Sequence, residues 1–251
     1  MTLNVEFVKV GTNYIWLIRK DNNVTVVDPG ASAPVIQYIS KHKLKLNSVL
    51  LTHNHSDHID GLPELVHPAL LVYGPNYESI QYCNRKLHEN DEIQILGETF
   101  KVLFTPGHTA GHISYVGDNK LFCGDVVFSG GCGRIFEGSA DTMYYSVMKC
   151  ASLPVETELY CGHEYTLENL RFAEKIEPDN PDIKERIDQV RALIARNNAS
   201  LPSSIGIELK TNPFMRCDQK QVKKAAENYA NRTLESPIRV FSVLRHWKNI
   251  F

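Results

Sequence analysis

Residues 52–58, with the sequence THNHSDH, place four possible metal ligands within six positions. They follow the apolar run at residues 48–51, which we expect to form a strand. In an extended chain His53 and His55 point to the same side, because alternate residues share a face. Asp57 and His58 come next, where we expect the chain to turn toward a helix and Gly61 to permit the bend. Imidazoles and carboxylates are costly to bury unless they are hydrogen-bonded or metal-bound. The segment therefore predicts a metal site rather than a solvated loop.

Three later apolar stretches end in the same way, with a glycine followed by one ligand-type side chain. These side chains are His108 after residues 101–104, Asp125 after residues 120–123, and His163 after residues 158–161. A glycine at that point lets the backbone turn tightly and approach its neighbours closely. In layered α/β folds, sites gather at the carboxyl ends of strands. Four strand ends that each deliver ligands therefore predict a single site.

The number of ligands favours two metal ions over one. A catalytic zinc ion needs about three protein ligands and an open position. Five histidines and two aspartates exceed that number, but they suit a pair of ions about 3.5–4 Å apart that share a water, provided that one carboxylate bridges them. We expect two divalent ions, with Zn2+ as the first choice; Fe and Mn are alternatives because imidazole and carboxylate groups accept all three metals.

The remaining histidines and the cysteines have simpler interpretations. Isolated histidines in polar or loop segments are expected to be solvated: His42, His67, His88 and His246. His112 lies near the predicted site, but the set of seven ligands is complete without it, so we expect it to have a supporting role. The six cysteines form no CxxC pair and several lie in apolar surroundings, which predicts buried free thiols.

The first two thirds of the chain are rich in short β-branched and aromatic runs separated by Gly, Pro, Asn and Asp. We expect strands at residues 14–18, 24–27, 48–52, 70–73, 98–104, 113–116, 120–123 and 158–161, and helices at residues 34–42 and 142–151. Many short strands with few helices predict sheets covered by helices, an α/β arrangement.

The pattern changes near Thr166. The segment 166–198 predicts two helices with a break at the sequence PDNP. An irregular stretch at residues 200–213 and two further helices follow. No low-complexity linker separates the two parts, so the tail is expected to pack on the first part. We divide the chain into a catalytic domain at residues 1–165 and a helical, substrate-binding domain at residues 166–251.

Bulk composition argues against several classes of partner. The 251 residues carry a formal net charge of -2, which gives no positive excess for binding nucleic acid. No apolar run approaches the roughly 20 residues that cross a bilayer, and the first residues lack the features of a secretory signal. We expect a cytoplasmic monomer that binds neither nucleic acid nor membrane.

The spacing THxHxDH, followed by the later His, Asp and His, resembles the metallo-β-lactamase superfamily. The resemblance implies a four-layer αββα sandwich, an α/β fold. It also implies the assignment of ligands: His53, His55 and His108 for the first ion, Asp57, His58 and His163 for the second, and Asp125 bridging both.

Other segments resemble one family of that superfamily, glyoxalase II or hydroxyacylglutathione hydrolase. They are GCGRIFEG at residues 131–138, GHEYT at 162–166, NPFMR at 212–216 and LRHWKNIF at 244–251. The resemblance covers essentially the whole chain. It implies hydrolysis of S-(2-hydroxyacyl)glutathione thioesters, S-D-lactoylglutathione above all, to D-lactate and glutathione by a metal-bridging hydroxide, in methylglyoxal detoxification. Asp125 and Asp57 are the catalytic residues implied, with Asp57 orienting the hydroxide.

The same resemblance implies a glutathione-binding groove between the two domains. The matching positions are Arg134, Phe136, Tyr165, Arg245 and Lys248. The two carboxylates of glutathione call for fixed cations, and Arg245 and Lys248 stand three apart on one helix face. Other members of the family can carry Lys and Tyr at positions 134 and 136; here the charge is kept, but Phe136 cannot donate a hydroxyl hydrogen bond. Arg216 is expected to be a structural anchor and no ligand.

Three alternatives remain open at this level. Two are other enzymes of the superfamily, a β-lactamase and a persulfide dioxygenase. A β-lactamase would more naturally be exported, and a dioxygenase of this fold would use a single iron and fewer ligands. The third is a metal-dependent binder of glutathione conjugates without catalysis, whose site would tend to be closed to water.

Overall fold

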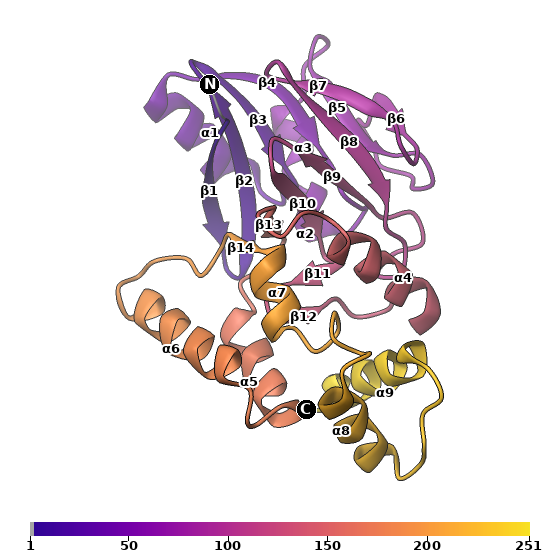
Figure 1. Cartoon of the computed structure of the whole chain (residues 1–251). Coiled ribbons are helices and arrows are strands. Elements are labelled where there is room, and N and C mark those ends of the chain that lie inside the picture. Colours follow the sequence, from indigo (N-terminus) through magenta and orange to yellow (C-terminus); the bar gives the residue numbers. More distant parts are fainter. Residues whose placement is uncertain (1–2) are drawn as a thin grey trace. The chain divides into compact units, whose positions relative to one another are not determined.

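The computed structural model describes residues 3–251 (Figure 1). Internal contacts divide these residues into two compact units. Unit 1 contains the described residues up to Phe104 together with Thr109–Gly124, and unit 2 contains Thr105–His108 and Asp125–Phe251. None of the described helices combines the length and the apolar character that crossing a bilayer requires.

Unit 1 begins with a six-stranded mixed sheet in the order β1-β2-β3-β4-β5-β6. Its strands are β1 Asn4–Val10, β2 Asn13–Lys20, β3 Asn23–Val27, β4 Lys45–Leu50, β5 Leu71–Pro75 and β6 Arg85–Leu87. The first three are antiparallel, and β3 to β6 run parallel. The carboxyl ends of β3, β4 and β5 therefore lie at one edge of the sheet.

Helix α1, Ser32–His42, covers one face of this sheet. Its Val35 packs with Ile15 and Leu17 of β2 and Val24 and Val26 of β3 in one buried cluster. The short helices α2, Ser56–Ile59, and α3, Leu62–Leu65, follow β4. The central residues of β2 are buried without alternation, as expected for a strand that is covered on both faces.

Four antiparallel strands complete unit 1: β7 Glu92–Ile95, β8 Glu98–Phe104, β9 Ile113–Gly117 and β10 Lys120–Gly124. They lie against the first sheet in Figure 1. The fully buried Tyr115 of β9 donates a hydrogen bond from its hydroxyl to the carbonyl oxygen of Leu51, at 2.7 Å. Burial raises the pKa of Tyr115 well above its ordinary value, so the phenol remains a donor. This bond fixes the chain just after β4, where the histidine cluster begins.

Unit 2 is mainly helical. Its strands are short: β11 Val127–Phe128 pairs with β12 Gly131–Cys132, and β13 Glu158–Cys161 pairs with β14 Ser203–Ser204. Its helices are α4 Ala140–Ala151, α5 Thr166–Ile176, α6 Pro181–Ala195, α7 Ile205–Thr211, α8 Lys220–Ala230 and α9 Pro237–Asn249. Asn180 caps α6 by accepting a hydrogen bond from the Asp182 amide, and Pro181 takes the first helical position.

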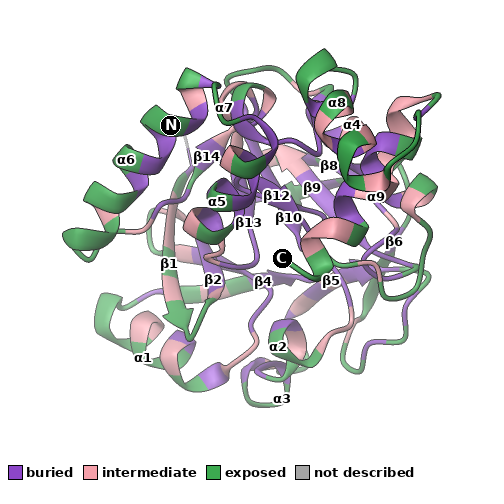
Figure 2. Cartoon of the chain, turned by 90° about the horizontal axis from the view of Figure 1, so that it is seen from below, coloured by how far each residue is buried: buried purple, intermediate pink, exposed green. Residues whose placement is uncertain are grey.

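Helices α5 and α6 pack through apolar residues at helical spacing. Leu170 and Ala173 of α5 contact Ile183, Ile187 and Val190 of α6 in one buried cluster. Figure 2 shows the opposite side of α6 as exposed, which is the amphipathic pattern that the sequence predicts.

Arg216 holds the end of α5. Its guanidinium donates two hydrogen bonds to the buried carboxylate of Glu177, at 2.8 and 2.9 Å, and a third to the carbonyl oxygen of Leu209. Both partners lie in unit 2, and Glu177 is only 2% exposed. The expectation that Arg216 is structural fits this geometry.

Replacing Arg216 with methionine should lower the free energy of unfolding by about 2–3 kcal/mol, because Glu177 would be left as a buried charge without its partner. Urea unfolding monitored by circular dichroism measures the change. The double variant Arg216→Met with Glu177→Gln serves as the control, and it should recover part of the loss. An unchanged midpoint in the single variant would contradict this account.

Most expected elements are present, with several differences. Strands β1, β6, β7, β11 and β12 were not predicted, and the strand expected at residues 48–52 ends at Leu50. The expectation of an irregular stretch at residues 200–213 was wrong, because this stretch contains β14 and helix α7. Ser204 starts α7 by accepting a hydrogen bond from the amide of Ile207. The cysteines agree with expectation: all six are free, and Cys83 alone is not buried.

Candidate metal centre and substrate site

The histidine-rich segment of unit 1 forms a compact set of ligand atoms. His53 is fully buried, and its Nε2 lies 3.1 Å from Nδ1 of His55. Two nitrogens bound to one tetrahedral zinc at 2.0–2.1 Å would stand about 3.3 Å apart, so this pair fits a shared ion. The residues after β4 are not in strand conformation, but the two histidines converge as expected.

Asp28 orients this set through hydrogen bonds on the side of the Nδ1 atoms. Its Oδ2 accepts hydrogen bonds from Thr52 Oγ1 at 2.7 Å and lies 3.1 Å from His58 Nδ1, while its Oδ1 accepts from the Thr52 amide at 2.8 Å. Thr52 Oγ1 also lies 3.0 Å from His53 Nδ1. With Nδ1 of both histidines donating to this network, Nε2 of each is the nitrogen that presents a lone pair to a metal.

Three buried residues each offer one possible ligand atom, and these atoms all lie within 4.8 Å of one another: Asp28, His53 and His58. Sequence reasoning missed Asp28. The signal that revealed the others is incomplete here, because Asp28 directly follows the apolar strand β3 with no glycine before it. Asp28 orients ligands and is not one of the seven predicted ligands, which explains why it lies outside that pattern.

Asp57 is held at the edge of the set. Asn13, the first residue of β2, donates from Nδ2 to the Asp57 carbonyl oxygen at 3.0 Å and to its Oδ2 at 2.9 Å. That Oδ2 lies 3.8 Å from His58 Nε2, and the side chain is about half exposed. Asp57 can therefore face both a ligand and solvent.

Two glycines in unit 1 have different roles. Gly61 has an ordinary helical backbone, with φ -78 and ψ -10, so the expectation that it permits a bend was wrong. A Cβ on Gly61 would lie 2.5 Å from the carbonyl oxygen of Pro29, so the position requires close approach. Gly124 has φ +47, and a Cβ there would lie 2.8 Å from His112 Nε2, which explains the glycine before Asp125.

His112 belongs to the supporting structure in unit 1. It is fully buried, and its ring stacks on His53 with centroids 4.9 Å apart. The four isolated histidines behave as expected: His42, His67, His88 and His246 are all exposed.

Unit 2 brings its three predicted ligands together. Asp125 Oδ2 lies 3.5 Å from His108 Nε2 and 3.2 Å from His163 Nε2, and all three side chains are buried. His108 Nδ1 lies 2.8 Å from the carbonyl oxygen of Arg134, which can only accept a hydrogen bond, so Nδ1 is the donor and Nε2 the ligand atom. A buried carboxylate between two imidazoles suits a cation.

Two of the predicted substrate-binding residues of unit 2 contact histidines of this set. Phe136 is 62% exposed and meets His108 edge-on at 5.2 Å. Tyr165 stacks on His163, with centroids 4.8 Å apart and an interplanar angle of 4°. The side chain of Arg134 is exposed, which leaves it accessible to a ligand.

Arg245 is buried rather than exposed on the helix surface. Its Nη1 donates to the carbonyl oxygens of Cys132 at 2.6 Å and Gly133 at 3.2 Å, and its Nη2 donates to Asn249. Within residues 3–251 its Nε has no hydrogen-bond partner and no carboxylate pairs with it. The guanidinium thus supports the loop that carries Arg134 and retains an uncompensated charge.

Lys248 lies one turn further along α9. Its ammonium is 3.4 Å from Glu168 and lies over the rings of Phe172 and Phe251. Burial lowers the pKa of Lys248, an effect that the neighbouring charges of Arg245 and Arg134 reinforce and Glu168 opposes. The proximity of three cations makes this side of unit 2 suitable for an anion.

Replacing Asp28 with asparagine should weaken metal binding by about 10- to 100-fold. The amide nitrogen would stand where Oδ2 now accepts from Thr52 and His58, so His58 would favour the tautomer with its proton on Nε2. Asparagine tolerates the left-handed backbone at this position, φ +50, so the fold should persist. Competition with a zinc indicator measures the affinity, and Asp21→Asn, also at positive φ, is the control. Equal affinity in Asp28→Asn and the unchanged chain would contradict the role given to Asp28.

Two family models match consecutive parts of the chain. Residues 8–163 match the model described as the metallo-beta-lactamase superfamily, and residues 164–251 match the model described as the hydroxyacylglutathione hydrolase C-terminus.

Similar proteins point in the same direction. A hydroxyacylglutathione hydrolase of Vibrio parahaemolyticus is 48% identical over 243 residues, and one of Nitrosomonas eutropha is 47% identical over 242 residues; each match covers 95% of both chains. Among solved structures, ETHE1 from Myxococcus xanthus has a TM-score of 0.65 at 23% identity and covers 100% of this chain and 99% of its own. The BLEG-1 B3 metallo-beta-lactamase has a TM-score of 0.64 at 20% identity and covers 85% of this chain and 99% of its own. These likenesses confirm the predicted fold class.

Proposed function

Because the chain belongs to the hydroxyacylglutathione hydrolase family of the metallo-β-lactamase superfamily, we propose that it hydrolyses S-(2-hydroxyacyl)glutathione thioesters, with S-D-lactoylglutathione as the main substrate. The products are a 2-hydroxy acid, D-lactate in that case, and glutathione, as methylglyoxal detoxification requires. The observation that carries the proposal is the buried set of His108, Asp125 and His163, which lies beside the residues expected to bind glutathione.

Seven residues are proposed to hold two divalent ions: His53, His55 and His108 for one, Asp57, His58 and His163 for the other, and Asp125 for both. The donor set supports this assignment, because in His53, His58 and His108 the Nδ1 atom faces a hydrogen-bonding oxygen and Nε2 is left for a ligand role. When bound, such ions lower the pKa of a shared water and polarise a carbonyl oxygen. Zinc is the proposed metal, with iron and manganese as the alternatives.

The chain itself positions the substrate and the proton-transfer groups. Asp57 is proposed to accept a hydrogen bond from the attacking water and so to orient it; its half-exposed side chain and its hydrogen bond from Asn13 support this role. Arg134, Arg245 and Lys248 are proposed to bind the carboxylates of glutathione, while Tyr165 supplies a hydroxyl that Phe136 lacks. No separate acid is needed, because a thiolate can leave unprotonated near neutral pH.

The organisation of the chain is proposed in the same terms. Residues 1–165 form the catalytic domain and residues 166–251 the helical substrate-binding domain; the two family matches, which meet between residues 163 and 164, support this division. We propose a cytoplasmic monomer that acts on a small molecule; six cysteines that form no disulfide suit a reducing compartment and support the location.

Comparing three substrates with the same purified protein tests the proposal. S-D-lactoylglutathione should be hydrolysed, whereas a β-lactam and glutathione persulfide should not be turned over at a comparable rate. Metal analysis of the same sample should find two ions per chain. Turnover of the β-lactam or of the persulfide alone would overturn the substrate assignment, and binding without turnover of any of the three would overturn catalysis.

Replacing Lys248 with alanine should raise KM for S-D-lactoylglutathione about tenfold and change kcat less than about threefold, because one charge-assisted contact to a carboxylate is lost. Steady-state kinetics measures both constants. Lys41→Ala, at an exposed lysine of α1, is the matched control and should leave both constants unchanged. A fall in kcat with KM unaltered would contradict a binding role for Lys248.

A further inference from the structure

A second pocket lies within unit 2, among helices α5, α8 and α9. It has a volume of about 610 Å³, within the range of about 300–1,000 Å³ that is usual for small-molecule sites. None of the proposed metal ligands or glutathione-binding residues lines it. The pocket is thus available to a ligand of its own.

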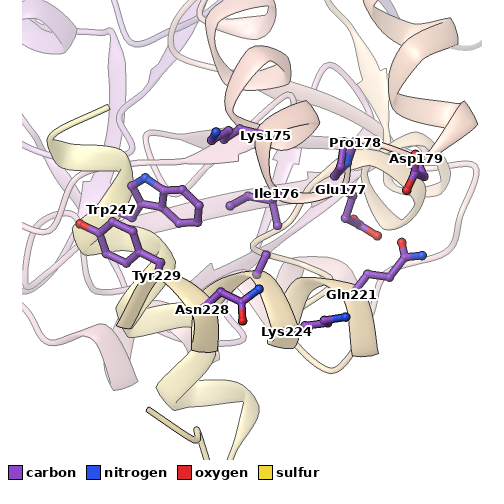
Figure 3. Close-up of a pocket in the computed structure, with 11 residues that line it drawn as sticks. Lys175, Ile176, Glu177, Pro178, Asp179, Gln221, Lys224, Asn228, Tyr229 and Trp247 are labelled. Carbon is purple, nitrogen blue, oxygen red and sulfur yellow. The ribbon is translucent and has the colours of Figure 1, made fainter. Parts of the chain in front are cut away.

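One end of the pocket is aromatic. The rings of Trp247 and Tyr229 are stacked, with centroids 4.3 Å apart and an interplanar angle of 8°. Figure 3 shows these rings at one end, with Ile176 beside them. Because the two side chains are pre-ordered by their own stacking and remain partly exposed, they offer apolar and π contact to a flat ring.

The other end carries charges that no partner in unit 2 compensates. Figure 3 shows Lys224, Gln221 and Asp179 there. All three are exposed, and among residues 3–251 no salt bridge engages Lys224 or Asp179. Glu177 also lines the pocket, but Arg216 neutralises it through two hydrogen bonds. One ammonium and one carboxylate are therefore available at this end.

A further ammonium, that of Lys175, lines the pocket from α5, and it also has no salt bridge in the described chain. Figure 3 shows Lys175 on the Trp247 side, away from Lys224 and Asp179. Two ammonium groups and one carboxylate without salt bridges line the pocket as a whole, which favours a ligand whose carboxylate matters more than its ammonium. Asn228, whose side-chain amide is exposed between the two ends, can donate and accept hydrogen bonds.

We propose that this pocket binds a free α-amino acid with an aromatic side chain. The ring of the ligand packs at the Trp247 and Tyr229 end, its carboxylate pairs with Lys224, and its ammonium pairs with Asp179. The aromatic end and the two opposite charges match the three groups of such a ligand. The inference is independent of the thioester hydrolysis.

Four probes separate the three groups of the ligand. L-phenylalanine carries all of them, 3-phenylpropionate lacks the ammonium, phenethylamine lacks the carboxylate, and L-alanine lacks the ring. Tryptophan fluorescence of the full chain, excited where phenylalanine does not absorb, measures binding. L-phenylalanine should bind most tightly, 3-phenylpropionate about threefold more weakly, and phenethylamine and L-alanine at least about tenfold more weakly.

Variants locate the site. Lys224→Ala should weaken L-phenylalanine binding about tenfold and Asp179→Asn about threefold, whereas Lys184→Ala, at an exposed lysine of α6 outside the pocket, should leave it unchanged. Trp247→Phe should remove the fluorescence change, because the other tryptophan, Trp16, lies in unit 1.

Four results would overturn the proposal: no saturable change with L-phenylalanine, equal binding of 3-phenylpropionate or L-alanine, unaltered affinity in Lys224→Ala, or a fluorescence change that persists in Trp247→Phe. None of these measurements uses turnover. A negative result here therefore does not affect the proposed hydrolase activity, and loss of the hydrolase proposal would not affect the proposed amino-acid site.

Discussion

Replacing Asp125 with alanine should lower kcat/KM for S-D-lactoylglutathione by at least about a thousandfold, which corresponds to about 4 kcal/mol of lost transition-state stabilisation. Asp125 lies between His108 and His163 in a buried position. If it bridges two ions, its removal weakens both at once, so metal content should fall below two ions per chain together with the rate.

The measurement pairs steady-state kinetics with metal analysis of the same dialysed sample. Glu156→Ala, which removes an exposed carboxylate outside the ligand set, is the control and should keep both rate and metal. Circular dichroism should show that Asp125→Ala remains folded. A fully active Asp125→Ala protein with two ions per chain would refute the bridging role.

Complete removal of metal by a chelator should reduce turnover to less than about one thousandth, because the ions would both activate the attacking water and polarise the thioester carbonyl. The apoprotein should also unfold at a lower temperature, since a ligand that binds only the folded state stabilises it. Adding two equivalents of zinc should restore both properties.

Parallel reconstitution with iron and manganese compares the three metals on the same apoprotein. The metal that restores the highest turnover is the one that the site prefers. Calorimetric unfolding of each form supplies a readout that is separate from turnover. Undiminished turnover in a sample shown to be free of metal would refute the two-ion mechanism altogether.

The burial and convergence of the proposed ligands were predictable because chemistry and local structure coincide there. His108 and His163 each come directly after a glycine that follows an apolar strand, and a buried imidazole has few structural explanations. Strands β8 and β13 were predicted with the bounds that the structure shows, since both are rich in aliphatic and aromatic residues and are followed by turn residues.

Other parts of the fold and of the site could not be predicted from the sequence, for physical reasons. The residues of strand β1 are partly buried or exposed and none is fully buried, so its period-two pattern is faint. Helix α7 is seven residues long, too short for a clear amphipathic pattern, and it depends on the Ser204 cap and the buried Glu208. Asp28 acts only through Thr52 and His58, and such contacts across the chain cannot be read from spacing.

Arg245 limits how this enzyme can be redesigned. Its guanidinium carries the charge proposed for glutathione and also fastens the carbonyl groups of Cys132 and Gly133. A library that randomises Arg245 to change substrate preference would therefore lose folded members along with affinity. Phe136 lies on the same loop and is 62% exposed, so directed evolution toward new acyl or thiol groups should start at Phe136 and keep Arg245 fixed.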